Sequence, residues 1–354
     1  MVLRAELLHR FKEFSQTTSA RAPLYSLLAA HIGDDPELAG LLEAAPDEQQ
    51  IPVLLFAAVH FMLLAGEGPR LAAFYPNLTE RAEVGDAFRE FRSFASDHAE
   101  ELRSIIATHR TQTNEVGRCA LFLPVFALLE AEVGPIAQLD VGASAGLNLL
   151  WDAYSYEYSS GGRLGVASSV HLQCIDRGGV PVPAMMPRRA RSLGLDLEPL
   201  DLADDQSVRW LEACVWPDQA DRFALLVAAI GLARAAPPEI RRADAVTAVG
   251  TLVAELASSG HATVTTSWVL NYLSATQRLD FVAALDAAGS RADFSWVCVE
   301  SPAQTVGLPI PTTAEPEHAT VVSLVRWRHG ERTVTRLATA HPHGYWLDWR
   351  LPAG

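Results

Sequence analysis

The fold is decided by the stretch Ile136-Ala137-Gln138-Leu139-Asp140-Val141-Gly142-Ala143-Ser144-Ala145-Gly146-Leu147-Asn148-Leu149-Leu150. An apolar run, a cluster of small residues and apolar residues at helical spacing predict a strand, a tight turn and a helix. Gly142 permits the turn, and Ser144 and Gly146 keep the helix start small. The N–H groups of the first helical turn would form an anion site, so we expect a nucleotide-like ligand. A turn that binds no ligand is the alternative.

The turn has the spacing Asp140-x-Gly142-x-Ser144-x-Gly146. A dinucleotide fingerprint needs a glycine where Ser144 stands, so NAD binding is only partly supported. A carboxylate repels a pyrophosphate, and Asp140 therefore favours a ligand with a positively charged amino-acid end. The pattern resembles the first motif of the class I S-adenosylmethionine-dependent methyltransferases. This resemblance implies S-adenosylmethionine as the cofactor, held by Asp140, Gly142, Ser144, Gly146 and Asn148.

The composition indicates a protein with a large core and an acidic surface. The 354 residues carry a formal net charge of -14, which disfavours nucleic acid as the main partner because phosphates require a basic field. No run of about 18 apolar residues occurs, so we expect no membrane span. The first residues lack a basic and then apolar segment, which predicts a cytoplasmic protein. We expect a small-molecule substrate, and the oligomeric state stays open.

Hydrophobic spacing divides the chain near residue 130. Residues 1–130 carry apolar side chains at helical intervals without strand-like alternation, which predicts an all-helical N-terminal domain that closes over a substrate. Strands and helices alternate in 131–354, so we expect an α/β domain with a doubly wound sheet. Alternating residues among glycines at about 156–187 predict a β-hairpin inserted into this domain.

Polar residues of the N-terminal region are candidate substrate contacts. His60 lies in an apolar helix, where a hydrogen-bonded core histidine is the alternative to a substrate contact. The polar run 111–118 precedes the next apolar helix, and a helix cap would use only one of its side chains. A ligand-facing loop is therefore as good an interpretation as a cap. The candidates in this run are Gln112, Asn114 and Arg118 for substrate binding and Glu115 for catalysis.

Carboxylates near the ends of the second and third strands are candidate nucleoside contacts. A Rossmann-like site needs a carboxylate at the end of the second strand for the ribose hydroxyls, and Asp196 is the first choice. Asp176 is its rival, and turn chemistry around Pro199 is the structural alternative. Asp244 ends the expected third strand, a position that lies beside the adenine in methyltransferase-like sheets. Capping the following helix is its competing role.

The segment after the fourth strand would face the reacting end of the cofactor in the resembling fold. Ser267 is a candidate cofactor contact, Trp268 a candidate substrate wall and Tyr272 a candidate catalytic residue. Core packing is the alternative for both aromatic residues. His341 and His343 have no evident third metal ligand, so no metal site is predicted. His343 is a candidate general base, with a surface turn as the alternative.

Segments from nearly the whole chain resemble an uncharacterised bacterial family, a domain of unknown function with a methyltransferase-like Rossmann fold. They are Gln112-Thr113-Asn114-Glu115 with Arg118, the turn 142–148, Gly194-Leu195-Asp196 with Pro199-Leu200-Asp201, Trp216-Pro217, and His343-Gly344. Alternation at 320–327 and 333–339 predicts a terminal antiparallel hairpin, as in the seven-stranded methyltransferase sheet. The resemblance implies a fold and a cofactor, and it implies no substrate.

Methyl transfer from S-adenosylmethionine to a small molecule is the leading hypothesis. The sulfonium already activates the methyl group, so the protein needs only to align a nucleophile and to supply a base. A binding protein that keeps the Rossmann-like shape without catalysis is the second hypothesis, because no recognisable catalytic tetrapeptide follows the fourth strand. An NAD-dependent oxidoreductase is the third, and Ser144 counts against it.

Overall fold

The structure is a computed structural model that describes residues 4–310 and 319–350. It divides into two compact units. The helical unit comprises Met1–Thr113 and Asp201–Val227, and the sheet unit comprises Asn114–Leu200 and Ala228–Gly354. This division differs from the expected boundary near residue 130, because the polar segment 114–118 and the helix after it belong with the sheet.

The helical unit is built around α4 (Pro52–Leu64), which is buried on almost every side. Around it lie α1 (Arg4–Thr18), α2 (Pro23–Ile32), α3 (Pro36–Ala39), α5 (Pro69–Ala72), α6 (Ala87–Asp97), α7 (Ala99–Thr108) and α9 (Asp205–Ala213), with short 3-10 turns at Gly40–Ala44 and Asp47–Gln49. Within residues 4–113 the structure contains no strand, as the helical spacing predicts. The last long helix, α10 (Ala220–Ala235), crosses the division between the units.

The sheet unit contains one mixed sheet in the order β3-β2-β4-β11-β10-β9-β8-β7-β1-β5-β6. Its strands are β1 (Ile136–Val141), β2 (Ser155–Tyr158), β3 (Gly161–Gly165), β4 (His171–Asp176), β5 (Arg189–Asp196), β6 (Ile240–Arg242), β7 (His261–Ser267), β8 (Phe294–Glu300), β9 (Thr320–Arg328), β10 (Glu331–Ala340) and β11 (Trp346–Trp349). The five strands from β6 to β8 run parallel, and β9 and β10 form the predicted antiparallel hairpin.

The sheet has eleven strands in the described residues, so the expected seven-stranded sheet is wrong. The insertion contains the predicted hairpin, formed by β2 and β3, and a third strand, β4, that pairs in parallel with β2. The short strand β11 then pairs with β10 on one side and with β4 on the other. Because β11 bridges the two, the insertion continues the sheet instead of standing apart from it.

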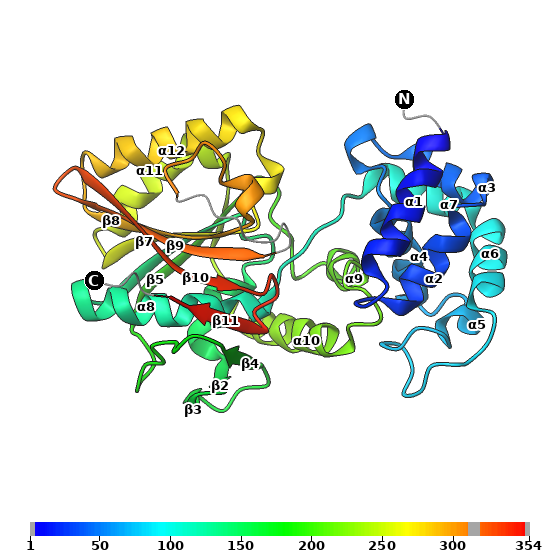
Figure 1. The fold of residues 1–354 in the computed structure, drawn as a ribbon, viewed down its shortest axis with the longest axis horizontal. Coiled ribbons are helices and arrows are strands. Elements are labelled where there is room, and N and C mark those ends of the chain that lie inside the picture. Colours follow the sequence, from blue (N-terminus) through cyan, green and yellow to red (C-terminus); the bar gives the residue numbers. More distant parts are fainter. Residues whose placement is uncertain (1–3, 311–318, 351–354) are drawn as a thin grey trace. The chain divides into compact units, whose positions relative to one another are not determined.

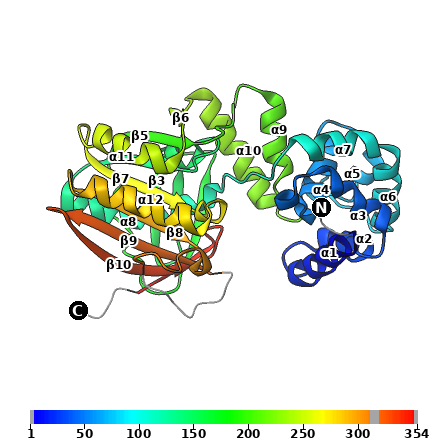
Figure 2. The same cartoon turned by 90° about the horizontal axis from the view of Figure 1, so that it is seen from above.

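Helices cover both faces of the sheet (Figure 1). Two of them, α11 (Ala245–Leu256) and α12 (Ala275–Gly289), lie side by side on one face, and α8 (Cys119–Val133) lies on the other (Figure 2). The core beneath α11 and α12 includes Leu139, Val264 and Trp296. Strand β1 is buried on both faces along its whole length, and its two polar side chains, Gln138 and Asp140, are buried with it.

The segment after β1 departs from the expected long helix. It forms a 3-10 helix, η4 (Leu147–Ala153), which is kinked at Leu150. The hydroxyl of Tyr154 donates to the carbonyl of Leu147 at 2.7 Å, and the hydroxyl of Tyr156 donates to that of Trp151 at 2.6 Å. These two hydroxyls therefore fasten both ends of the 3-10 helix to the start of the inserted strands.

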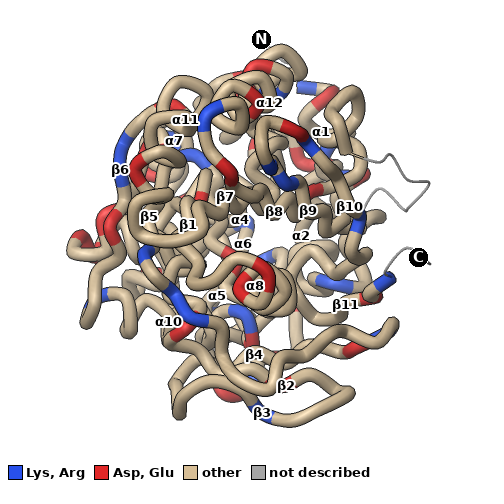
Figure 3. Tube along the Cα trace, turned by 90° about the vertical axis from the view of Figure 1, so that its left-hand side faces the viewer, with Lys and Arg blue, Asp and Glu red and all other residues tan. Residues whose placement is uncertain are grey.

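Acidic and basic segments are interspersed along the chain (Figure 3). None of the helices within 4–310 and 319–350 has the length and apolar character that a membrane crossing requires.

Candidate functional site

Polar side chains gather at the carboxyl ends of the parallel strands. From β1 the chain passes to β5 and β6 on one side of the sheet, whereas β7 leads to β8 on the other side. The strand order thus reverses between β1 and β7, which makes the carboxyl ends of these strands a topological switch point, the place where open α/β sheets bind ligands. At or near the ends of these strands stand Asp140 on β1, Asp196 on β5, Ser267 on β7 and Glu300 on β8.

The Asp140 carboxyl is held by a buried chain of hydrogen bonds. Trp151 Nε1 donates to Gln138 Oε1 at 3.0 Å, Gln138 Nε2 to Thr265 Oγ1 at 3.1 Å, and Thr265 Oγ1 to Asp140 Oδ1 at 2.7 Å. Burial raises the pKa of Asp140 to about 7, and the nearby Asp196 charge adds to the rise. The bond from Thr265 and the charge of Arg118 oppose it.

Glu300 is a second buried carboxyl, and sequence reasoning missed it. Its oxygens accept hydrogen bonds from the amides of Val269 at 3.2 Å and Leu270 at 3.4 Å, and it also bonds to Thr266. Burial raises the pKa of Glu300 to about 7 against these bonds and the Arg118 charge. The available signal was a charged residue at the end of an otherwise apolar strand.

Arg118 connects separate segments of the sheet unit. Its Nη1 donates to the carbonyl of Ser267 at 2.9 Å, and its Nε donates to the carbonyl of Pro342 at 2.9 Å. The guanidinium lies 5.9 Å from the ring centre of Trp268. At 7% exposure, Arg118 is a buried cation beside two buried carboxyls. It therefore positions the ends of the strands, and its positive charge favours the ionised form of both carboxyls.

Glu115 and His343 form the second polar pair of the site. His343 Nδ1 lies 3.0 Å from Glu115 Oε2, and the glutamate side chain is only 5% exposed. The backbones beside them touch closely, since a Cβ on Gly117 would lie 2.2 Å from the carbonyl oxygen of His343. At this distance the carboxylate stabilises the protonated form of the imidazole as an ion pair.

Two amides of the bend after β1 have acceptors within the chain, and both of its glycines are closely packed. The amide of Ser144 donates to Asp196 Oδ2 at 2.7 Å, and the amide of Leu147 donates to Asn114 Oδ1 at 3.0 Å. A Cβ on Gly142 would lie 2.3 Å from Val269 Cγ2. The space beside Gly146 is likewise occupied, by the side chains of Pro238 and Ile240. The amides of Ser144 and Leu147 therefore have acceptors within the chain, and close packing together with positive φ angles explains both glycines.

Backbone strain lies at both ends of the switch point. Ser144 has φ 54° and Trp268 has φ 55°, in the left-handed region that non-glycine residues rarely adopt. The third such residue within 4–310 and 319–350 is His329, in the turn of the β9–β10 hairpin. The Ser144 hydroxyl is also buried without a hydrogen-bond partner among the described residues. Strain and an unpaired hydroxyl at one position are typical of a functional site.

A family model described as an uncharacterized protein conserved in bacteria (DUF2332) matches residues 8–349. The chain belongs to this family. Comparisons with curated proteins and with solved structures give no significant match. For this DUF2332 chain, the assignment of residues to roles therefore depends on the geometry of the site.

The other candidate site residues have structural roles or lie outside the cluster of polar side chains at the carboxyl ends of the parallel strands. Asp244 caps α11 through a bond from the amide of Thr247, and Asp176 accepts bonds from the amides of its own turn. Asn148 accepts from the Cys119 thiol at 3.4 Å. Tyr272 is 65% exposed.

His60 and Gln112 belong to the helical unit and not to the sheet unit that holds the cluster. His60 Nδ1 lies 3.0 Å from the Ala213 carbonyl, and its Nε2 lies 3.0 Å from Asn77 Nδ2. Burial lowers the pKa of His60 to about 4. It therefore has the contacts of a neutral core histidine, which was the structural alternative.

Proposed function

We propose that the sheet unit binds S-adenosylmethionine at the carboxyl ends of β1 and β5 and transfers its methyl group to a small molecule. The observation that carries the proposal is the position of Asp140 and Asp196 on neighbouring parallel strands, on either side of the bend at Ser144. A carboxylate after the second strand of such a sheet is the group that binds ribose hydroxyls.

The charges of this edge favour a cationic ligand. Asp140 and Asp196 are close enough for each charge to affect the other, and Glu300 adds a third carboxyl near the same arginine. A sulfonium or an α-amino group would relieve this repulsion, whereas a pyrophosphate would increase it. The same argument disfavours a nicotinamide dinucleotide.

The residues of the bend fit such a ligand in part. The Ser144 hydroxyl is buried and lacks a partner, and Asp196 keeps acceptor capacity beyond its bonds from the amides of Ser144 and Glu198. Val269 fills the space beside Gly142. We therefore assign the ligand contacts to Asp140, Ser144 and Asp196, and we assign none to Gly142.

When bound, the sulfonium supplies an activated methyl group. The chain must then orient the nucleophile and remove its proton where it carries one. His343 is the candidate base, because the Glu115 carboxylate lies 3.0 Å from its Nδ1 and favours the proton that the imidazole would take up. Trp268, held by a bond from its Nε1 to the Thr320 hydroxyl at 2.8 Å, is the candidate wall of the substrate pocket.

Calorimetry with S-adenosylmethionine, its demethylated product and NADH tests the proposal. We expect the first two to bind and NADH not to compete with them. Asp196→Asn keeps an acceptor for the Ser144 amide but removes the charge, and we expect it to weaken binding at least tenfold. Asp176→Asn is the matched comparison, because Asp176 also accepts loop amides but lies on the insertion. An equal loss in both variants would contradict the assignment to Asp196.

Turnover separates an enzyme from a binding protein. Transfer of a labelled methyl group to a small-molecule library should occur with the wild-type chain and fall at least a hundredfold in His343→Gln, while cofactor affinity stays unchanged. Binding without transfer by the wild type would favour a non-catalytic binding protein. Absence of binding at millimolar S-adenosylmethionine would overturn the proposal altogether.

A further inference from the structure

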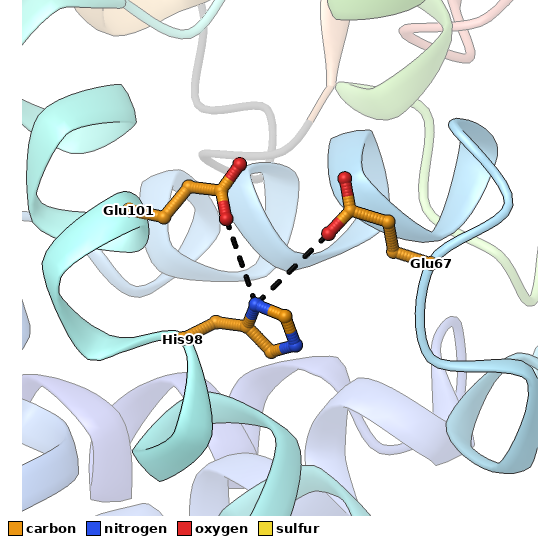
Figure 4. Close-up of side chains that lie close together, drawn as sticks. All are labelled: Glu67, His98 and Glu101. Carbon is orange, nitrogen blue, oxygen red and sulfur yellow. Dashed lines mark ion pairs between the residues drawn. The ribbon is translucent and has the colours of Figure 1, made fainter.

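We propose that the helical unit binds a divalent transition-metal ion, best matched by Zn²⁺, through Glu67, His98 and Glu101. One ligand atom from each residue lies within 4.8 Å of the other two. His98 Nδ1 is 3.5 Å from Glu101 Oε2 and 4.0 Å from Glu67 Oε2, and both carboxylates point toward the imidazole (Figure 4). Sequence reasoning did not find this cluster, because Glu67 is 31 positions before His98.

The backbone holds these three residues in place without a metal. His98 ends α6 and begins α7, and Glu101 follows it by three positions on the same face of the helix. Glu67 lies in the turn after α4, where its amide donates to the carbonyl of Met62 at 3.2 Å. The ligand positions therefore come from two helix ends and one tight turn.

One buried ring positions both sides of the cluster. Phe94 is 6% exposed, and its ring centre lies 4.5 Å from that of His98. The turn of Glu67 packs on the same ring, since a Cβ on Gly68 would lie 2.6 Å from Phe94 Cδ2. The imidazole and the glutamate turn are thus held against opposite parts of one side chain, which lowers the cost of organising a metal site.

Charge provides the second, independent argument. Among the described residues, neither Glu67 nor Glu101 forms an ion pair with lysine or arginine, and each pairs only with His98. By contrast, Glu100 in the same helical turn pairs with Arg103 at 2.6 Å. Two carboxylates that meet at one imidazole leave at least one negative charge unbalanced. A divalent cation would neutralise both carboxylates.

The ligand set selects the type of metal. Zinc binds histidine nitrogen and carboxylate oxygen at about 2.0–2.2 Å, which places tetrahedral ligands roughly 3.3–3.5 Å apart. The two contacts of His98 need only small rotations of half-exposed glutamates to reach this spacing. A nitrogen ligand disfavours Mg²⁺ and Ca²⁺, which prefer oxygen. A water would complete the fourth position, and the bound ion would fasten the α4–α5 turn to α7.

Calorimetry of the metal-stripped full chain with ZnCl₂ and MgCl₂ tests this proposal without any use of S-adenosylmethionine. We expect one Zn²⁺ per chain with much weaker Mg²⁺ binding, and a rise in the melting temperature with Zn²⁺. Glu67→Gln and Glu101→Gln should each weaken Zn²⁺ binding at least tenfold. Glu100→Gln, in the same first turn of α7 but paired with Arg103, is the matched control and should leave the affinity unchanged.

The glutamate variants decide the outcome, because His98→Ala also alters the junction between α6 and α7. The chain has 11 histidines, so Zn²⁺ binding that survives in both glutamate variants would assign the ion to another place and overturn the proposal. Equal losses in Glu100→Gln and Glu101→Gln, or equal affinity for Mg²⁺ and Zn²⁺, would overturn it as well.

Discussion

Arg118 Nη1 donates to the backbone carbonyl of Ser267 at 2.9 Å, across 149 positions of sequence. The bond joins the segment before α8 to the last residue of β7, next to the switch point of the sheet. The same side chain reaches the Pro342 carbonyl in the turn between β10 and β11. One buried cation thus holds three segments around the candidate site.

Replacing Arg118 with methionine should destabilise the sheet unit by about 3 kcal/mol, because two carbonyls lose their donor and two buried carboxyls lose their cation. Urea unfolding measures this free energy. Arg103→Met removes a half-exposed arginine that pairs with Glu100, and it should change stability by less than about 0.5 kcal/mol. Similar values for the two variants would show that Arg118 does not hold the site together.

Asp140→Asn should make the protein less sensitive to rising pH. The pKa of Asp140 is about 7 in the folded chain, above its ordinary value of 3.8, so the folded state binds more protons between these values. Stability is then highest below about pH 4 and falls as the pH rises through 7. Between pH 4.5 and 8 the wild type should lose about 2–4 kcal/mol relative to the variant. Glu300 titrates in both proteins and cancels in the difference, which urea unfolding at the two pH values gives.

Strand β1 could be predicted from the sequence because it is a short run of mostly apolar residues, and the β9–β10 hairpin because its apolar residues alternate. Asp196 ends β5 beside β1, as expected for the carboxylate of the second strand. The eleven-stranded sheet could not be predicted, since β11 is four residues long and its pairing with β4 depends on tertiary contacts. The 3-10 helix after β1, where a long helix was expected, carries hydrogen bonds from the hydroxyls of Tyr154 and Tyr156, which a periodic pattern does not reveal.

The candidate site was predictable where chemistry and position coincide in the sequence. Asp140 was recognised because it precedes the glycine turn, and Arg118 because the polar run 111–118 exceeds what a helix cap needs; the structure buries both. Contacts between residues far apart in the sequence could not be inferred. Glu115, for example, meets His343 across 228 positions. The glycine motif has a second explanation, since Val269 packs against Gly142. A motif of small residues therefore indicates a close approach without identifying what approaches.

Gly142→Ala should destabilise the chain by about 2–4 kcal/mol, because the new Cβ would meet Val269 Cγ2 at 2.3 Å and the backbone has φ 72°. Val269→Ala alone should cost about 1–2 kcal/mol through lost packing. The double variant should be more stable than the sum of the two losses predicts, by about 1 kcal/mol, because the clash is relieved while the φ strain remains. Additive losses in urea unfolding would place the clash elsewhere.

His60→Gln should remove a dependence of stability on falling pH, opposite in sign to that of Asp140. Burial lowers the pKa of His60 from 6.5 to about 4, so the unfolded chain binds the extra proton first. Stability from the neutral imidazole is complete above about pH 6.5 and is lost as the pH falls toward 4. The variant should therefore be less stable than the wild type at pH 7.5, and the deficit should shrink by about 2–3 kcal/mol at pH 4.5. His9→Gln, at an exposed position, is the control, and a deficit that stays constant between the two pH values would mean that the fold does not lower the pKa of His60.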